Sequence, residues 1–352
     1  MIDTPCSVPK VVAVTRIYDL AMTHQLDTDD YFIHCVQKLC AAERLNFFLI
    51  EPAWVEQFHA YLEQGKVWPR VLLNMHSEHH QPDDIYHRLV KLAAERGTQV
   101  IDPPDRALAA FDKSRLHPRL VEVGVPVPWT LIVPHDQAQD WRMTEEQRQE
   151  LGSPFIIKPA MGYGRKGLVM DATSEADLQR SIAAWPDDNY LLQRRVNPRR
   201  VNGEPLYFRT FHVFDAVYLT WWNCFTDQYR LVAPQEQEEF DLGQVEEVVE
   251  RVAALTGMGF FSSEIAQDET GQLVVIDYVN DQCHLLSQTA SPQLGVPDSL
   301  VGNIAAKLVE GVTGLLGRAP LTGSGQGHST GPGHARSAGS EQAPSTGSGH
   351  AP

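Results

Sequence analysis

The first third of the chain alternates short apolar runs with amphipathic stretches. In two of these stretches, apolar side chains recur at helical spacing, which predicts helices over 29–45 and 84–96. The apolar runs predict strands at VVAVT (11–15), FFLI (47–50), VLLN (71–74) and QVI (99–101). Because strands alternate with helices, we expect an α/β domain with a mostly parallel sheet.

From Phe155 onward, the pattern changes to pairs of apolar strands joined by short turns. These pairs are PFIIK with GLVM, YFRTFHVF with AVYLTWW, and FFSSEIA with QLVVIDYV. Helical spacing recurs at 174–185, at 298–316 and at 243–256, where Gly257 would end the helix. Short turns join antiparallel strands, so this part of the chain is predicted to be α+β with antiparallel sheets.

These patterns divide the 352 residues into three parts. The α/β domain comes first, and the α+β module follows it. The remaining residues, 318–352, are rich in small and polar side chains and contain no Phe, Tyr or Trp. Such a segment buries too little apolar surface to offset its loss of conformational entropy, so we expect a disordered C-terminal tail.

The composition excludes several classes of partner. With 29 Lys and Arg against 45 Asp and Glu, the formal charge is −16, whereas nucleic-acid binding depends on basic residues that neutralise phosphates. No apolar stretch reaches the roughly 18 residues of a membrane span. The five cysteines are scattered and the N-terminus does not resemble a secretion signal. We therefore expect a cytoplasmic protein that binds neither nucleic acid nor membrane.

The segment PFIIKPAMGYGRKG, residues 154–167, carries the strongest chemical signal. An apolar strand presents Lys158, and a loop with Gly162, Gly164 and Gly167 leads into the next strand. Glycines let backbone N–H groups approach a phosphate closely, and the lysine adds a positive charge. Walker and Rossmann loops both enter a helix, so this loop is of neither kind. The pattern predicts a phosphate-binding flap, although a solvent-exposed hairpin would explain it as well.

A second signal is the predicted hairpin FFSSEIAQDETGQLVVIDYVND, residues 260–281. Glu264 lies on its first strand, Asp277 lies near the end of the second, and Asn280 and Asp281 follow. Carboxylate and amide oxygens suit Mg²⁺, a hard ion that also binds substrate phosphates. The hairpin therefore predicts a metal site, with a strand that merely ends in polar residues as the alternative.

Together, the glycine loop and the acidic hairpin resemble the ATP-grasp superfamily. The resemblance covers residues 100–312 and begins at DPPDRALAAFDKSRLHPRLVEVGVPVPWT, which carries Lys113 and a Val-Pro-x-Pro sequence. The segment LLQRRV, residues 191–196, lies between the two motifs. The resemblance implies an α/β domain over residues 1–105, followed by an ATP-grasp module of antiparallel sheets over 106–317, with subdomains over 106–196 and 197–317. It also implies ATP and Mg²⁺ as cofactors.

For the nucleotide, the resemblance implies two sets of contacts. The phosphates would be contacted by Lys113 and Lys158 and covered by the loop that contains Gly162, Gly164 and Gly167. Adenine would be bound by a hinge, mostly through backbone groups, at Gln193, Arg194, Arg195 and Val196. Glu204 is a weaker candidate for the ribose hydroxyls.

For the reaction, the resemblance implies that Lys158 and Arg209 are catalytic. Arg209, on the strand YFRTF, would face the transferred phosphate or the intermediate. The Mg²⁺ ligands would be Glu264, Asp277 and Asn280.

The metal motif departs from the family, which usually has Glu-x-Asn where this chain has Asp-Tyr-Val-Asn, residues 277–280. The extra residue matters because alternate strand residues face opposite sides of a sheet. Either a β-bulge restores the direction of Asn280, or Asp281 replaces it. The hinge departs too, because it has Gln-Arg-Arg where an acidic residue is common.

These implications predict an ATP-dependent ligase that joins a small carboxylate to an amine or similar nucleophile through an acylphosphate. Two alternatives stay open: a kinase of the same fold that phosphorylates a small anionic alcohol, and a non-catalytic nucleotide-binding module. An arginine cluster fits an anionic substrate and equally fits a solvated loop; its members are Arg194, Arg195, Arg199 and Arg200. A homodimer is compatible with the sequence, which carries no signal for the oligomeric state.

Overall fold

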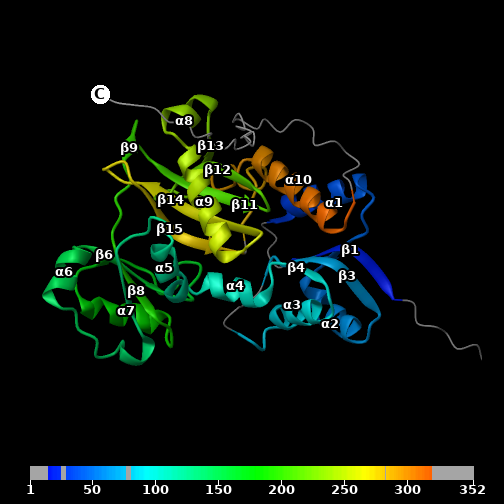
Figure 1. The fold of residues 1–352 in the computed structure, drawn as a ribbon, viewed down its shortest axis with the longest axis horizontal. Helices are drawn as coiled ribbons and strands as arrows, with labels where there is room; N and C mark the ends of the chain where they lie inside the picture. The colour runs from blue at the N-terminus through cyan, green and yellow to red at the C-terminus, as the bar shows by residue number, and fades with distance from the viewer. Residues whose placement is uncertain (1–14, 25–28, 77–80, 282, 319–352) are drawn as a thin grey trace, which may run out of the picture.

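Three main sheets form the framework of the protein in the computed structural model, which describes residues 15–24, 29–76, 81–281 and 283–318 (Figure 1). The N-terminal sheet has the strand order β2-β1-β3-β4, and all its strands are parallel. The other two sheets, β5-β8-β6-β7 and β13-β12-β11-β14-β15, are antiparallel. The prediction of an α/β domain followed by an α+β module is therefore confirmed, and the predicted tail from 319 onward lies outside the described residues.

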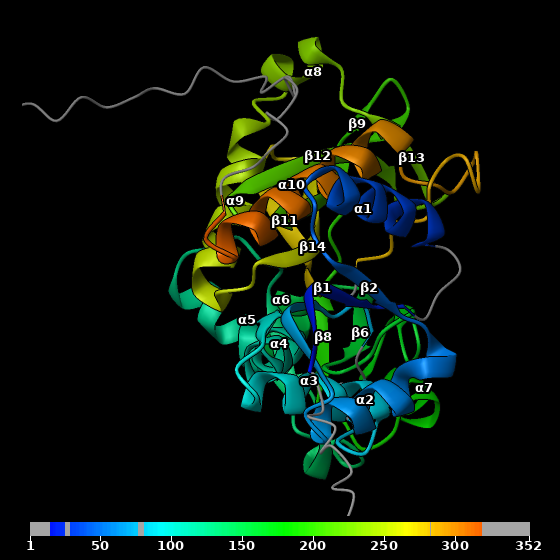
Figure 2. The same ribbon diagram turned by 90° about the vertical axis from the view of Figure 1, so that its right-hand side faces the viewer.

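The N-terminal domain is built on β1 (Arg16–Thr23), β2 (Phe47–Ile50), β3 (Val67–Leu73) and β4 (Gln99–Ile101). Its helices are α1 (Asp30–Ala42), α2 (Val55–Glu63) and α3 (Ile85–Glu95). Side chains alternate across the sheet, so Leu20 packs in the core with α1, whereas Ala21 packs in the core with α2 and α3. The predicted last helix, α10 (Asp298–Leu315), lies beside α1 on this domain (Figure 2).

The first strand is the main difference from the predicted elements. Residues 11–14 of the predicted strand lie outside the described residues, and the first described strand is β1. Asp19 lies within β1, only 8% exposed, where its carboxylate contacts Arg70 Nη1 at 3.4 Å and Arg318 Nη2 at 3.0 Å. Because charged residues interrupt the apolar pattern of β1, hydrophobic periodicity did not reveal this strand.

The first antiparallel sheet contains β5 (Thr130–Val133), β6 (Phe155–Pro159), β7 (Val169–Ala172) and β8 (Tyr190–Arg194). Its outer face packs against α6 (Glu145–Leu151) and α7 (Leu178–Ala184). The helix predicted over 174–185 is divided, because a 3₁₀ turn at Glu175–Asp177 precedes α7. Two helices precede this sheet in the chain, α4 (Pro104–Phe111) and α5 (Lys113–Glu122).

The second antiparallel sheet contains β11 (Tyr207–Val213), β12 (Ala216–Asn223), β13 (Gln228–Leu231), β14 (Phe260–Gln267) and β15 (Leu273–Asn280). Smaller elements beside it are β9 (Arg200–Val201), β10 (Glu204–Pro205) and α8 (Pro234–Glu239). The helix α9 (Gly243–Thr256) packs on one face and ends at Gly257, as predicted, where φ is 68° in the left-handed region. The opposite face packs partly against α10. None of the described helices combines the length and apolar character of a membrane span.

Candidate active site

Three predicted site residues form one row across the second antiparallel sheet. Arg209 on β11 pairs with Glu264 on β14, which in turn pairs with Asp277 on β15. The Arg209 guanidinium donates to Glu264 Oε1, and the Tyr207 hydroxyl donates to Glu264 Oε2 at 2.8 Å. Both oxygens of Glu264 are thus held by neighbours on the same sheet face, which fixes the orientation of the carboxylate.

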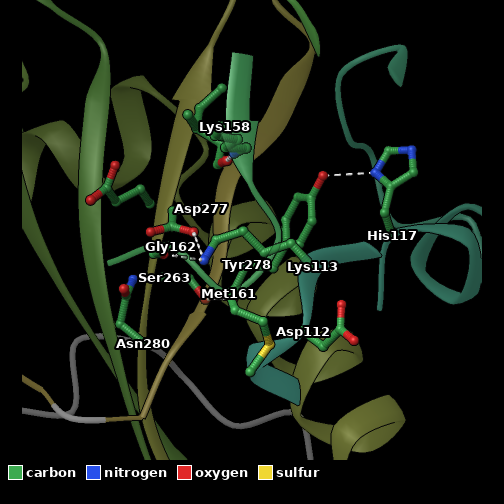
Figure 3. Close-up of polar contacts among 12 residues, drawn as sticks. Asp112, Lys113, His117, Lys158, Met161, Gly162, Ser263, Asp277, Tyr278 and Asn280 are labelled. Atoms are coloured by element: carbon green, nitrogen blue, oxygen red, sulfur yellow. Dashed lines mark hydrogen bonds and ion pairs between the residues drawn. The ribbon is translucent and has the colours of Figure 1, made fainter. Parts of the chain in front are cut away.

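Two lysines from other elements reach this row. Lys113 begins α5, and its Nζ lies 3.8 Å from Asp277 Oδ1 and donates to Gly162 O at 3.2 Å (Figure 3). Lys158 on β6 donates from Nζ to Ile276 O at 2.8 Å, which bridges the two antiparallel sheets. Residues from three distant segments therefore meet between the sheets.

The charges of this group leave a cationic excess. Burial alone would raise the pKa of Asp277, but Lys113, Lys158 and Arg209 hold it below its ordinary value. Burial raises the pKa of Glu264, although Arg209 opposes the shift. Burial also lowers the pKa of Lys158 to about 8, so this lysine is mostly protonated at pH 7. With both carboxylates ionised, three cations face two anions, which favours an anionic ligand.

The base of the predicted phosphate loop is held rigidly. The Asp188 carboxylate accepts a hydrogen bond from Met161 N at 2.7 Å where the loop leaves β6. At the other end, Gly167 has a φ of 72°, and a Cβ there would lie 2.6 Å from Pro159 Cγ. Only glycine fits this close approach without strain, so the fold itself requires a glycine at position 167, in addition to its predicted role in the phosphate loop.

The tip of the loop is more open. Gly164 has a φ of 58°, and a Cβ there would meet nothing within 4 Å. The next residue, Arg165, contacts Asp227 at 2.7 Å in the turn between β12 and β13, and both side chains are largely exposed. This ion pair links the loop of the first sheet to the second sheet across the mouth of the site.

The predicted hinge residues separate into two groups. Gln193 is 2% exposed and points toward the second sheet, where its Nε2 donates to Tyr278 OH at 2.7 Å. Val196 packs in a small apolar cluster that includes Tyr207, beside Glu264. In contrast, the Arg194 side chain pairs with Glu150 of α6 at 2.8 Å. A pocket of about 270 Å³ beside the hinge is lined in part by Arg194, Arg195 and Val196.

The structure does not bring Glu204 to this group. Glu204 lies on β10, and its carboxylate contacts Arg230 at 3.0 Å. The Arg230 guanidinium lies over the Trp221 ring, which packs with the α9 core. Because Trp221 pairs with Phe208, one position from Arg209, it lies on the opposite face of the sheet. The Glu204 carboxylate is therefore turned away from the cleft.

The extra residue of the metal motif is accommodated by an irregular register. Glu264 pairs with Asp277, but Ser262 pairs with Asn280, so two steps along β14 face three along β15. This shift brings Asn280 to the face that carries Asp277 (Figure 3). Asp281 lies instead near Asp102 of the N-terminal domain, where its charge adds to burial in raising the pKa of Asp102 to about 6. The geometry thus favours Asn280 as the third donor.

This donor set fits a hard cation. Asp277 Oδ1 is buried, and its nearest charged neighbour is Lys113 Nζ at 3.8 Å. Two carboxylates and an amide oxygen match the preference of Mg²⁺, which keeps other positions for water and substrate phosphates. Within the described ranges, no three His, Cys, Asp or Glu side chains gather as a complete metal cage.

Several side chains at this site were not found from the sequence. Tyr207 donates to Glu264 at 2.8 Å, and Tyr278 links Gln193 to His117 through two hydrogen bonds of 2.7 Å each. Tyr207 lies two residues before Arg209 on the same strand, so strand alternation could have revealed it. No sequence pattern connects His117 with Tyr278, because these residues meet only when helix α5 packs against β15.

Comparisons with solved structures identify the class of fold. D-cycloserine synthetase DcsG matches with a TM-score of 0.58 and 16% identity, over 84% of this chain and 99% of that chain. A RimK-domain ATP-grasp protein from Sphaerobacter thermophilus matches with a TM-score of 0.56 and 17% identity, over 83% and 98%. The ATP-grasp ligase PsnB, complexed with a minimal precursor, Mg and ADP, matches with a TM-score of 0.55 and 15% identity, over 84% and 98%.

The chain therefore has the ATP-grasp fold, as the sequence resemblance predicted. No protein-family description matches the sequence, and no curated protein matches it. Sequence identities this low establish the fold alone, and the reaction must be argued from the site.

Proposed function

We propose that this protein is an ATP- and Mg²⁺-dependent ligase that joins a carboxylate to an amine or similar nucleophile through an acylphosphate. The observation that carries the proposal is the convergence of Lys113, Lys158, Arg209, Glu264 and Asp277 between two antiparallel sheets. A cationic excess beside two carboxylates suits a triphosphate together with a divalent cation.

In this reaction, the lysines and Arg209 would supply most of the charge neutralisation. Lys113 and Lys158 would bind the phosphates, and Arg209 would stabilise the negative charge that develops as the phosphoryl group moves to the substrate carboxylate. Mg²⁺ held by Glu264, Asp277 and Asn280 would neutralise further charge on the phosphates. The nucleophile would then displace phosphate from the acylphosphate.

Nucleotide binding would require rearrangement at the centre of the site. Lys158 Nζ now contacts Ile276 O, and Lys113 Nζ contacts Gly162 O. Phosphate oxygens would replace these carbonyl acceptors, so the two sheets would separate slightly and the loop would lie over the phosphates. By excluding water, the closed loop would protect the acylphosphate from hydrolysis.

The structural neighbours support this reaction class. One is described as a ligase in complex with a precursor, Mg and ADP, and another as D-cycloserine synthetase. We infer that the substrates here are small molecules or peptides that carry a carboxylate or an amine, with the protein acting in the cytoplasm.

The direct test is a screen of amino acids and short peptides, alone and in pairs, for ADP and free phosphate. A ligase forms both products only when carboxylate and nucleophile are present together. ADP without free phosphate would instead identify a kinase, and nucleotide binding without ADP formation would identify a non-catalytic module. Either outcome would overturn the ligase proposal.

A pair of variants separates the site from general effects on folding. Asp277→Asn removes a carboxylate from the cleft and should lower ADP formation at least a hundredfold. Asp215→Asn removes an exposed carboxylate that contacts Lys307 at 2.7 Å on another part of the protein, and it should leave ADP formation within twofold. Equal losses in both variants would refute the assigned site.

A further inference from the structure

A buried hydrogen-bond network links the predicted adenine hinge to the second sheet. Gln193 Nε2 donates to Thr130 Oγ1 at 3.0 Å and to Tyr278 OH at 2.7 Å. Tyr278 OH also lies 2.7 Å from His117 Nδ1 (Figure 3). Tyr278 is fully buried and His117 is 6% exposed, so water has little access to compete for these bonds.

The hydrogen bonds of Thr130 determine how the Gln193 amide is oriented. Thr130 Oγ1 donates to Pro128 O at 2.8 Å, so it has no proton left to donate and must accept from Gln193. This fixes the orientation of the Gln193 amide, with nitrogen toward Thr130 and Tyr278. Both amide protons are then used, and Oε1 remains as an acceptor. Among the described residues, no hydrogen bond reaches Gln193 Oε1.

The histidine tautomer completes the network. In the arrangement that uses every donor, Tyr278 OH accepts from Gln193 and donates its own proton to His117 Nδ1. The ring is then neutral and carries its proton on Nε2. Burial, with a further effect of the nearby Lys158 charge, lowers the pKa of His117 to about 4, which keeps the ring neutral.

Each of the three residues His117, Tyr278 and Gln193 lies on a segment that is predicted to contact the nucleotide or its metal ion. His117 lies on α5 four residues after Lys113, so both lie on one side of that helix. Tyr278 follows Asp277 on β15, and Gln193 belongs to the hinge on β8. The network thus couples the hinge to the segments that carry a phosphate-contacting lysine and a metal-binding carboxylate.

We propose that Tyr278 and His117 are positioning residues that fix the Gln193 amide so that its Oε1 accepts a hydrogen bond from the base of the bound nucleotide. An acceptor at this point favours a base with an exocyclic amino group, such as adenine. It disfavours a base with a carbonyl oxygen at the same position, such as guanine, because two acceptors would face each other. The inference rests on the proposed function only in requiring that a nucleoside triphosphate binds in the cleft.

The first experiment compares Tyr278→Phe with the wild-type protein in calorimetric titrations with Mg-AMPPNP and Mg-GMPPNP. Without the tyrosine hydroxyl, the Gln193 amide can turn over and present a donor to the base. The affinity for the adenine nucleotide should fall about tenfold, whereas that for the guanine nucleotide should change less than threefold. General destabilisation would lower both affinities alike and leave their ratio unchanged, so the ratio reports on base selection.

Two further variants test the contribution of His117 to the network. His117→Ala should reproduce the change in the ratio, and His117→Asn should restore most of it because the asparagine Oδ1 can replace Nδ1 as the acceptor. Tyr190→Phe is the matched control, since Tyr190 is 1% exposed and donates to Trp185 O at 2.7 Å in the same sheet. This control should leave the ratio within twofold.

The histidine tautomer provides a test that does not depend on nucleotide binding. Nitrogen-15 NMR of the free protein should show His117 protonated on Nε2 alone and untitrated down to about pH 4. A proton on Nδ1 would overturn the network, and an unchanged nucleotide ratio in Tyr278→Phe would overturn its role in base selection. If neither nucleotide binds while the expected tautomer is found, the proposed function fails, whereas the network itself stands.

Discussion

Lys158 offers a test in which stability and binding should change in opposite directions. Its side chain is mostly buried between two sheets, and burial lowers its pKa from 10.5 to about 8. We consider Lys158→Met, which keeps the length of the side chain but removes the charge. The substitution removes a cation that is costly to bury in the free protein and that would bind phosphate in the complex.

The expected change in stability follows from the pKa shift of Lys158. A pKa lowered from 10.5 to about 8 means that the folded protein disfavours the charged lysine by about 3 kcal/mol. Loss of the hydrogen bond to Ile276 O offsets about 1 kcal/mol of this. Lys158→Met should therefore stabilise the nucleotide-free protein by about 1–2 kcal/mol, which raises Tm of a chain this long by roughly 1–3 °C. Affinity for Mg-ATP should fall about 10–100-fold, because a charge-assisted hydrogen bond contributes about 1.5–3 kcal/mol.

The pH dependence has a definite sign. Between about pH 8 and pH 10.5, the unfolded chain keeps the Lys158 proton and the folded chain has lost it, so this lysine makes the free energy of unfolding rise with pH. Below about pH 8, Lys158 is charged in the folded protein and lowers the free energy of unfolding by its full amount. Mg-ATP binding needs the protonated lysine, so the affinity of the wild-type protein should fall as pH rises above about 8. Lys158→Met should lack both effects.

The measurements are thermal unfolding without nucleotide and calorimetric titration with Mg-AMPPNP between pH 7 and 9. Lys307→Met is the matched control, because Lys307 Nζ contacts Asp215 at 2.7 Å and Glu310 at 3.1 Å at the surface. This control should leave nucleotide affinity within twofold and should not raise Tm. A lower Tm or unchanged nucleotide affinity in Lys158→Met would refute the account of this lysine.

Three other predictions concern the loop and the metal. Gly167→Ala should raise the KM for ATP at least tenfold, because its Cβ would lie 2.6 Å from a proline carbon. Gly164→Ala, whose Cβ would meet nothing within 4 Å, should change the KM less than fivefold. Steady-state kinetics compares the two variants, and equal effects would contradict the rigid loop base. Arg165→Glu should raise the KM for ATP about two- to threefold, and adding Asp227→Arg should recover it; without recovery, the ion pair has no part in closing the loop. Removal of Mg²⁺ with a chelator should abolish ADP formation, and Asp277→Asn should raise the half-saturating Mg²⁺ concentration at least tenfold; activity in excess chelator would exclude the metal assignment.

Local patterns in the sequence carried much of the architecture. The change from alternating strands and helices to paired strands predicted both sheet types, since side-chain periodicity depends only on which face each residue buries. The helices over 243–256 and 298–316 were recognisable for the same reason. The strand β1 was not, because Asp19 is buried there through pairing with Arg70 and Arg318, which are distant in sequence.

Motifs predicted much of the candidate site as well. The glycine loop and the acidic hairpin indicated Lys158, Glu264 and Asp277, because each motif is local and its chemistry depends on residue types at short spacing. Glu204 shows the limit of such inference. The family resemblance made it a candidate for the ribose, but Arg230 holds it on the opposite face of the sheet.

The sequence alone determined the periodicity, the glycine loop and the residue types that can bind phosphate and magnesium. Only the tertiary structure decided that Asn280, rather than Asp281, lies beside Asp277, because a register shift depends on the partner strand. Likewise, only the packing of helix α5 and two sheets brings His117, Gln193 and Tyr278 into one network. The direction of a side chain follows from local backbone geometry, but its hydrogen-bond partners depend on chain segments that meet after folding.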